Sequence, residues 1–310
     1  EILQVHAKRV KLDPSVDLMA LARSTAGCSG ADLMNILNEA ALVAARKGRS
    51  AVTSGDALEA CDKVRYGKER RSLELTEEEK RTTASHESGH AIVGLIVEHA
   101  DPVEKVTIIP RGMSLGATYF VPERNRVSYW KKELRDRLAV LMGGRIAEDT
   151  FLGDISSGAQ MDIAQATKLA RSMVCEWGMS DALGAVAYED RVSDSQAMMG
   201  QSSSTYSPET AKAIDAEVRM ILDAANEMAT QIIADHREQV DLMAKMLLEF
   251  EILDKEDVKA IVDGTWDVDA KRKKLQQELE AHTKEPPPPP SLREREPHRG
   301  IDPRPRPQGI

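Results

Sequence analysis

Aromatic residues are scarce in this chain, and long apolar runs are missing from its sequence. Phe, Trp and Tyr make up 4% of the 310 residues, although hydrophobic residues of all kinds make up 41%. Aliphatic side chains and the 13 Met must therefore fill the core. A membrane-spanning helix needs about 20 consecutive apolar residues, and no run in the sequence comes near that length. We therefore expect these residues to be soluble and to form two domains.

Cysteine, positive charge and a phosphate-binding loop are also scarce or missing. Cys28, Cys61 and Cys175 are odd in number, lie far apart and form no CxxC pair, which predicts reduced and buried thiols. The net charge of −9 argues against nucleic acid as a partner, because nucleic-acid binders carry basic patches. No GxxxxGK(S/T) loop occurs, so these residues are not expected to hydrolyse ATP on their own.

The most informative segment is HESGH at residues 86–90. Residues four apart lie on the same face of a helix, so His86 and His90 can aim two imidazoles at one point. Two neutral imidazoles at this spacing are typical of a zinc site, and the carboxylate of Glu87 can deprotonate a water bound to the ion. The alternative is a helix with two solvated histidines, but the surrounding sequence favours the metal site.

The surrounding sequence predicts that this segment belongs to a core helix. Thr76 and Glu79 form a capping box that starts a helix just upstream, and the apolar residues 91–97 continue it. Gly89 costs such a helix about 1 kcal/mol relative to Ala. A close approach of another backbone or of a ligand would explain its presence.

A catalytic zinc needs a third protein ligand and one open position for water. Val93 and Ile96 occupy the places where a metzincin has Gly and His, and no Glu lies between residues 105 and 121, where a thermolysin-like ligand would fall. Asp162 and Glu148 remain, each on the apolar stripe of a predicted helix, where a carboxylate must be paired or must bind metal. Spacing favours Asp162, whose helix a capping box over residues 157–160 would begin. Glu148 stays open as a rival ligand or as a partner of a histidine, and a buried salt bridge is the plain alternative for either acid.

Six ordered motifs carry a family resemblance. They are CSGADL at 28–33, GKERRS at 67–72, HESGHAIVG at 86–94, VTIIPRG at 106–112, GGRIAE at 143–148 and SSGAQMDI at 156–163. From about residue 4 to 264 the sequence resembles the C-terminal part of the FtsH family of membrane-anchored, ATP-dependent zinc proteases. The resemblance implies one Zn²⁺ per chain, held by His86, His90 and Asp162, with Glu87 as the catalytic residue.

The resemblance also implies a fold and a domain order. We expect a mainly α (α+β) protein, in which an incomplete helical lid of an AAA+ ATPase module at 1–64 and a linker at 65–75 precede a mostly helical, zincin-type peptidase domain with a small β-hairpin at 76–269. Gly30 and Ala31 are candidates for contact with nucleotide in a full-length protein. For this sequence we favour an ordinary helix start capped by Ser29.

The family context extends to partners and location. The resemblance implies a longer protein that forms a homohexamer, uses ATP and Mg²⁺ in its ATPase core, and degrades unfolded or membrane proteins. Such a protein is expected in the bacterial inner membrane or an organelle membrane, with these residues on the cytoplasmic or matrix side.

Periodicity predicts the individual elements. Strands are expected at 103–109 and 117–121, forming a hairpin whose exposed edge could accept a substrate peptide by strand addition. Helices are expected at 32–46, 51–64, 128–151, 161–177, 208–235, 238–249 and 255–262, with a polar loop at 191–207. From residue 270 to 310 we expect a disordered Pro/Arg-rich tail, since nine of the 14 prolines follow residue 285.

Two alternatives to a zinc endopeptidase that works within an ATP-dependent protease remain open. A stand-alone zinc peptidase without ATPase coupling is disfavoured by the incomplete lid. A non-catalytic helical assembly module is disfavoured by the intact HESGH segment.

Overall fold

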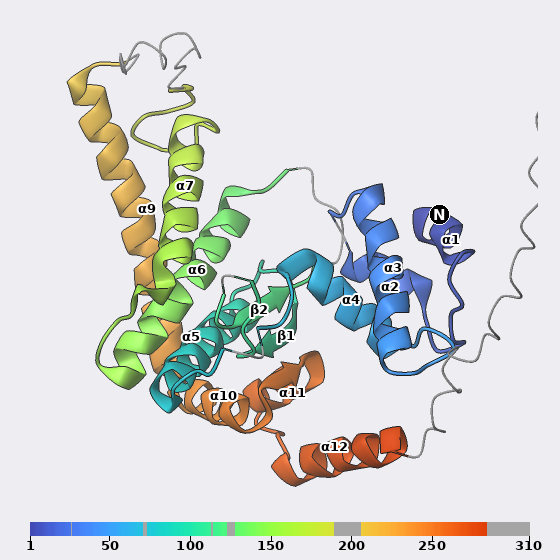
Figure 1. Ribbon diagram of the computed structural model, residues 1–310. Helices are drawn as coiled ribbons and strands as arrows, with labels where there is room; N and C mark the ends of the chain where they lie inside the picture. The colour runs from blue at the N-terminus through green and yellow to red at the C-terminus, as the bar shows by residue number, and fades with distance from the viewer. Residues whose placement is uncertain (26, 71–72, 113, 123–127, 189–205, 284–310) are drawn as a thin grey trace, which may run out of the picture.

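The computed structural model of the protein describes residues 1–25, 27–70, 73–112, 114–122, 128–188 and 206–283. Within these residues the fold is mainly helical, with one three-stranded antiparallel sheet (Figure 1). Most of the predicted loop at 191–207 and the proline-rich residues after 283 lie outside the described residues. In the described part of the chain, no helix combines the length and the apolar character that crossing a bilayer requires.

Four helices form an N-terminal unit with a core of its own. They are α1 (Ile2–Ala7), α2 (Leu18–Ser24), α3 (Gly30–Arg46) and α4 (Ser54–Tyr66). Capping boxes begin the two longer helices, Ser29 with Asp32 on α3 and Thr53 with Asp56 on α4. The apolar faces of α3 and α4 meet in a cluster of small and aliphatic side chains, which includes Ile36, Leu37, Ala40, Val52, Ala57 and Ala60.

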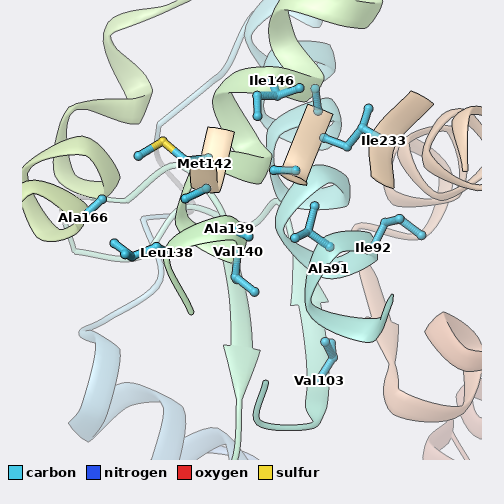
Figure 2. Close-up of a cluster of buried hydrophobic side chains, with 14 of the residues drawn as sticks. Ala91, Ile92, Val103, Leu138, Ala139, Val140, Met142, Ile146, Ala166 and Ile233 are labelled. Atoms are coloured by element: carbon cyan, nitrogen blue, oxygen red, sulfur yellow. The ribbon is translucent and has the colours of Figure 1, made fainter. Parts of the chain in front are cut away.

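A second and larger core follows. Its helices are α5 (Glu77–Ile96), α6 (Lys131–Leu152), α7 (Gln160–Cys175), α9 (Pro208–Asp235), α10 (Arg237–Phe250) and α11 (Lys255–Val262). Figure 2 shows buried side chains of this core from three helices, among them Ala91 and Ile92 of α5, Ala139 and Ile146 of α6, and Ile233 of α9. Aliphatic and Met side chains dominate this core, as the scarcity of aromatics predicts.

Two glycines bring α5 and α6 into backbone contact. A Cβ atom at Gly89 would lie 2.3 Å from the carbonyl oxygen of Gly143, and a Cβ at Gly143 would lie 2.7 Å from the carbonyl oxygen of Gly89. The predicted close approach at Gly89 is therefore confirmed, and its partner is the backbone of α6. This contact fixes the distance between the two helices that carry most of the candidate site.

The predicted hairpin is present, and a third strand extends it. β1 (Val103–Thr107) pairs antiparallel with β2 (Ala117–Phe120) and, on its other side, with β3 (Ile252–Asp254), which gives the order β2-β1-β3. β2 is thus an edge strand. The sequence did not predict β3, because its three residues are too few to show an alternating pattern.

The C-terminal prediction is wrong for residues 270–283, which are helical rather than disordered. They belong to α12 (Val268–Thr283), drawn apart from the other helices in Figure 1. The carboxylate of Asp267 caps its first turn by accepting hydrogen bonds from the backbone of Asp269 (3.0 Å) and Ala270 (3.1 Å). Lys271, 9% exposed, forms ion pairs with Asp254 and Asp257. Ion pairs hold this helix where the sequence offers few apolar side chains, so composition gave no sign of it.

Two smaller predictions also need correction. Ser156, rather than the predicted box over 157–160, caps the short 3-10 turn Ser157–Ala159 that precedes α7, and α7 itself has no side-chain cap. The charged pair Arg70-Arg71 in the linker predicts a solvated hinge rather than a binding patch. The side chain of Arg70 is exposed, but its backbone N–H donates to the carbonyl of Pro110 (2.9 Å). The linker is therefore bonded to the turn after β1 and is not a freely solvated hinge there.

All three cysteines are free thiols. Cys61 and Cys175 are buried as predicted, and Cys28 is half-buried.

Candidate metal centre

His86 and His90 lie one turn apart on the buried face of α5. Their Nε2 atoms are 3.0 Å apart, and their rings meet nearly edge-to-face, with centroids 4.6 Å apart and an interplanar angle of 79°. Both residues are at most 9% exposed. The helix therefore delivers two imidazole nitrogens to one buried point, as the spacing predicts.

The structure brings Asp162 to the same point. It lies in the first turn of α7, and its Oδ2 is 3.3 Å from Nε2 of His86 and 3.5 Å from Nε2 of His90. One possible ligand atom from each of the three residues lies within 4.8 Å of the other two. Zinc bonds of about 2.0–2.2 Å at tetrahedral angles place neighbouring ligand atoms roughly 3.3–3.6 Å apart. The donor set and its spacing therefore fit a zinc ion.

The outer nitrogens of both imidazoles are already committed to hydrogen bonds. Nδ1 of His90 lies 2.7 Å from the carbonyl oxygen of Val140, which can only accept, and Nδ1 of His86 lies 2.7 Å from Oε1 of Glu148. With Nδ1 as the donor, neutral imidazoles turn unprotonated Nε2 atoms toward each other and toward the Asp162 carboxylate. In that tautomer, lone pairs and a negative charge converge on one point, which is an arrangement suited to binding a cation.

The electrostatics of the cluster agree with this geometry. Burial disfavours a charged His86, but its hydrogen bonds with Asp162 and Glu148 outweigh burial and raise the pKa of His86 to about 10. Burial also works against an ionised Asp162, yet its hydrogen bonds with the two histidines hold its pKa well below the usual value. The two carboxylates thus favour positive charge at His86, and a bound cation would supply that charge in place of a proton.

Glu148 lies behind His86 rather than beside Asp162. It is 1% exposed, and its second oxygen accepts a hydrogen bond from the backbone N–H of Ser156 (2.6 Å). Although burial opposes ionisation, the hydrogen bonds from His86 and Ser156 outweigh it and lower the pKa of Glu148. Of the two acids that the spacing left open, the structure places Asp162 on the Nε2 side of the histidines and Glu148 on the Nδ1 side of His86.

Glu87 is buried on the neighbouring face of α5. It is 7% exposed, and one carboxylate oxygen accepts a hydrogen bond from the hydroxyl of Thr118 on β2 (2.8 Å). Burial is the main cause that raises the pKa of Glu87, while the charges of His90 and His86 act in the opposite direction. A carboxyl group with a raised pKa is a better proton acceptor than an exposed one, which suits a general base.

Gly144, the second residue of the GGRIAE motif at 143–148, also belongs to the site. A Cβ there would lie 2.5 Å from Cε1 of His86 and 2.6 Å from Nε2 of both histidines. Sequence reasoning had one signal for it, because a glycine pair inside a predicted helix is unfavourable and needs a packing or functional reason.

A cleft of about 1320 Å³ runs past the cluster. His86, Glu87, His90 and Asp162 line it, together with residues 114–118 on the hairpin. The cleft is large enough for several residues of an extended peptide, and the edge strand β2 forms part of its wall.

The other predicted site residues lie elsewhere. Gly30 and Ala31 form the first turn of α3, where Ser29 caps the helix with Asp32. They belong to the N-terminal core and take no part in the metal centre, which is consistent with an ordinary helix start.

Comparisons with known proteins assign the two cores separately. The family model described as "Peptidase family M41" matches residues 73–261, and the model described as "AAA+ lid domain" matches residues 15–59.

The chain is 64% identical over 295 residues to a protein of Chlamydia trachomatis serovar L2 named "ATP-dependent zinc metalloprotease FtsH", a match that covers 94% of this chain and 32% of the relative. It is 64% identical over 289 residues to the protein of the same name from Protochlamydia amoebophila, covering 92% of this chain and 31% of the relative. A protein of Methylacidiphilum infernorum named "ATP-dependent zinc metalloprotease FtsH 2" is 53% identical over 265 residues, which cover 84% of this chain and 41% of the relative. The chain spans about a third of the length of the first two relatives.

Proposed function

We propose, from the premise that this chain belongs to peptidase family M41, that it is the proteolytic part of an ATP-dependent zinc endopeptidase. The observation that carries the proposal is the convergence of two imidazole Nε2 atoms and one carboxylate, next to a buried Glu, on the wall of a peptide-sized cleft. His86, His90 and Asp162 are proposed as the zinc ligands and Glu87 as the catalytic residue.

The residues of the chain divide the work of amide hydrolysis among them. His86 and His90 would hold the ion, and Asp162 would offset part of its charge. Glu148 and the carbonyl of Val140 orient the two imidazoles through Nδ1. When bound, zinc supplies Lewis-acid chemistry that activates water near neutral pH and polarises the scissile carbonyl.

Proton transfer falls to Glu87. Its carboxylate takes a proton from the attacking water, holds it as the amide nitrogen becomes a leaving group, and then donates it to that nitrogen. The peptide itself is proposed to lie along β2, where main-chain hydrogen bonds to an edge strand bind sequences of many kinds. We expect loose rather than folded chains as substrates, because an extended segment is needed.

The names of the relatives and the lid match support a larger assembly. In a full-length protein we propose that residues 1–64 belong to an AAA+ module that uses ATP and Mg²⁺, that residues 65–75 link it to the peptidase, and that the peptidase begins at residue 76. The assembly is proposed to be a homohexamer at a membrane that degrades unfolded or membrane proteins.

The assignment of the third ligand has a direct test in zinc content. Asp162→Ala should lose most bound zinc and all proteolysis, whereas Glu148→Gln should keep the ion with affinity lowered roughly 10- to 100-fold, as is usual for partners of ligating histidines. Equilibrium dialysis followed by metal analysis would measure both. Unchanged zinc in Asp162→Ala together with its loss in Glu148→Gln would transfer the ligand role to Glu148.

A further inference from the structure

We propose that Thr118 is a positioning residue, which holds the carboxylate of Glu87 in the orientation that proton transfer needs. The inference rests on the proposed peptidase function and adds to it a role for the edge strand β2. It starts from a hydrogen bond that joins the sheet to the candidate base: the Thr118 hydroxyl lies 2.8 Å from Oε2 of Glu87.

The register between β2 and α5 makes this contact specific. Alternate residues of the hairpin face the helix: Gly116, Thr118 and Phe120. A Cβ at Gly116 would lie 2.9 Å from Cγ of Glu87, and the ring of Phe120 fills the space beside Gly94, two helical turns further along α5. The contacts on either side thus hold Thr118 against Glu87, while the intervening Tyr119 is buried on the opposite face.

Glu87 has few other constraints. Three rotatable bonds separate its backbone from its carboxylate, and among the described residues Thr118 is the one side chain recorded as a hydrogen-bond partner of that carboxylate. The absence of a Cβ at Gly116 leaves room for the Glu87 side chain to run along the hairpin. Without the hydroxyl, packing would still confine the Glu87 stem, but no side-chain hydrogen bond among the described residues would fix the orientation of its carboxylate.

The hydroxyl also has a second acceptor within reach. Oγ1 of Thr118 lies 3.1 Å from the main-chain carbonyl oxygen of the same Glu87. While Glu87 is a carboxylate, the hydroxyl donates to it. While Glu87 holds the proton taken from water, the carboxyl group can donate to Oγ1, and the hydroxyl hydrogen turns to the carbonyl oxygen. One side chain can therefore support both forms of the base without leaving an unpaired hydrogen.

The arrangement links substrate binding to catalysis. Residues 117 and 118 line the cleft from the edge strand on which a peptide is proposed to lie. The strand that aligns the scissile bond is then the same strand that aligns the base. A shift of β2 would therefore disturb the alignment of both the peptide and the base.

Thr118→Val is the isosteric test, measured on the whole chain with an unfolded casein peptide carrying a fluorescent reporter. We expect kcat to fall about 10- to 100-fold with KM changed by less than about 3-fold, because misplacement of a catalytic group costs rate rather than binding. Thr118→Ser keeps the hydroxyl and should restore kcat to within about 3-fold of wild type. Zinc content should be unchanged in both variants.

Thr107→Val is the matched control. It removes another hydroxyl of the same sheet, one that donates to the carbonyl of Glu251 (3.0 Å) and does not touch Glu87. It should lower the melting temperature without lowering kcat. The inference is overturned if Thr118→Val keeps wild-type kcat, if Thr118→Ser is as slow as Thr118→Val, or if Thr118→Val loses zinc along with activity. A wild-type chain that binds zinc and cuts nothing would instead contradict the proposed function.

Discussion

Gly144 is the residue at which the metal centre tolerates least change. Any side chain there would meet both imidazoles, since a Cβ would lie 2.5–2.6 Å from their ring atoms. The histidines could yield only by rotating away from Asp162 and from their Nδ1 partners. The glycine is therefore part of the site, although it carries no functional group.

Gly144→Ala should weaken zinc binding roughly 10- to 100-fold while the helices still form, because small shifts of ligating imidazoles cost about as much as losing their supporting hydrogen bonds. Competition with a fluorescent chelator would measure the affinity. Gly55→Ala is a suitable control, because a Cβ there meets only ordinary contacts at 3.9 Å. Wild-type affinity in Gly144→Ala would mean that the imidazoles are not held where the structure places them.

How far the site could be predicted differs from residue to residue. The spacing of His86 and His90 follows from helix geometry alone. Asp162 and Glu148 could both be named as candidates, but spacing could not decide which of them is the ligand. That depends on which nitrogen of the imidazole each acid reaches, and so on how α6 and α7 pack. Thr118 gave no signal, since strand register against a helix is a tertiary property that periodicity does not contain.

At the scale of single elements, the first turn of α4 contains a buried acid that both caps the helix and forms ion pairs. Asp56 is fully buried, completes the capping box with Thr53, and forms ion pairs with Arg49 (2.9 Å) and Lys47 (3.2 Å). Burial acts to raise the pKa of Asp56, but these hydrogen bonds outweigh burial and leave it below 3.8. The N-terminal core should therefore be most stable where this carboxylate is ionised.

A lowered pKa in the folded state means that the stabilisation is present above the unfolded value near 3.8 and is lost as the pH falls further toward the folded value. The protection factors of the α3 and α4 amides against hydrogen exchange should accordingly fall as the pH drops below 3.8, and Asp56→Asn should abolish this pH dependence. At pH 6 that variant should lose about 1–3 kcal/mol of local stability, since charge-assisted hydrogen bonds are removed. Asp32→Asn is the comparison, because it breaks the exposed capping box of α3, in which Asp32 accepts a hydrogen bond from Ser29. This variant should lose less stability than Asp56→Asn. Equal effects would show that the ion pairs contribute nothing.

The helix α12 is attached by charge rather than by apolar packing. Lys271 is buried between Asp254 and Asp257, whereas Lys274, which also lies near Asp254 (3.4 Å), is 57% exposed. The lysine pair and the backbone of Asp257 lower the pKa of Asp254 to about 2 in spite of its burial. Lys271 is the buried cation of this contact, and the more exposed Arg272 adds an ion pair with Glu249 of α10 (2.7 Å).

Lys271→Met should release α12 by removing about 3 kcal/mol of docking free energy, because it leaves buried carboxylates without their cation. Limited proteolysis after residue 268 would report the release, and zinc content should not change, since α12 is absent from the metal centre. Lys274→Met makes the same change of charge at an exposed position and should leave α12 docked. If both variants behaved alike, net charge and not the buried pair would hold the helix.

Helix positions were predicted correctly where apolar residues recur at helical spacing, and incorrectly where a helix lacks that pattern. α9 at 208–235 and α11 at 255–262 have the predicted bounds, because each shows an apolar face with a clear start signal at Ser207 and Asp254. α12 was expected to be disordered, since its mean composition is charged and the partners of Lys271 lie on other elements.

At the scale of the whole molecule, the chain contains two cores that do different work. All residues of the candidate metal centre come from the larger core, on α5, α6, α7 and β2, and they line its cleft. The smaller core is joined to it through the linker and through ion pairs of Asp62 with Lys105 and Arg111. Because no residue of the smaller core lies among the proposed ligands, we expect the chemistry to belong to the larger core.

The most direct test of the account measures bound zinc and cleavage of unfolded casein on the same samples of wild type, Glu87→Gln and His86→Ala. We predict one zinc per wild-type chain with cleavage, one zinc in Glu87→Gln with activity lower by about 100- to 10,000-fold, the range that a general base contributes, and neither zinc nor cleavage in His86→Ala. Normal turnover by Glu87→Gln, or wild-type protein that takes up no zinc when supplied with it, would contradict the account.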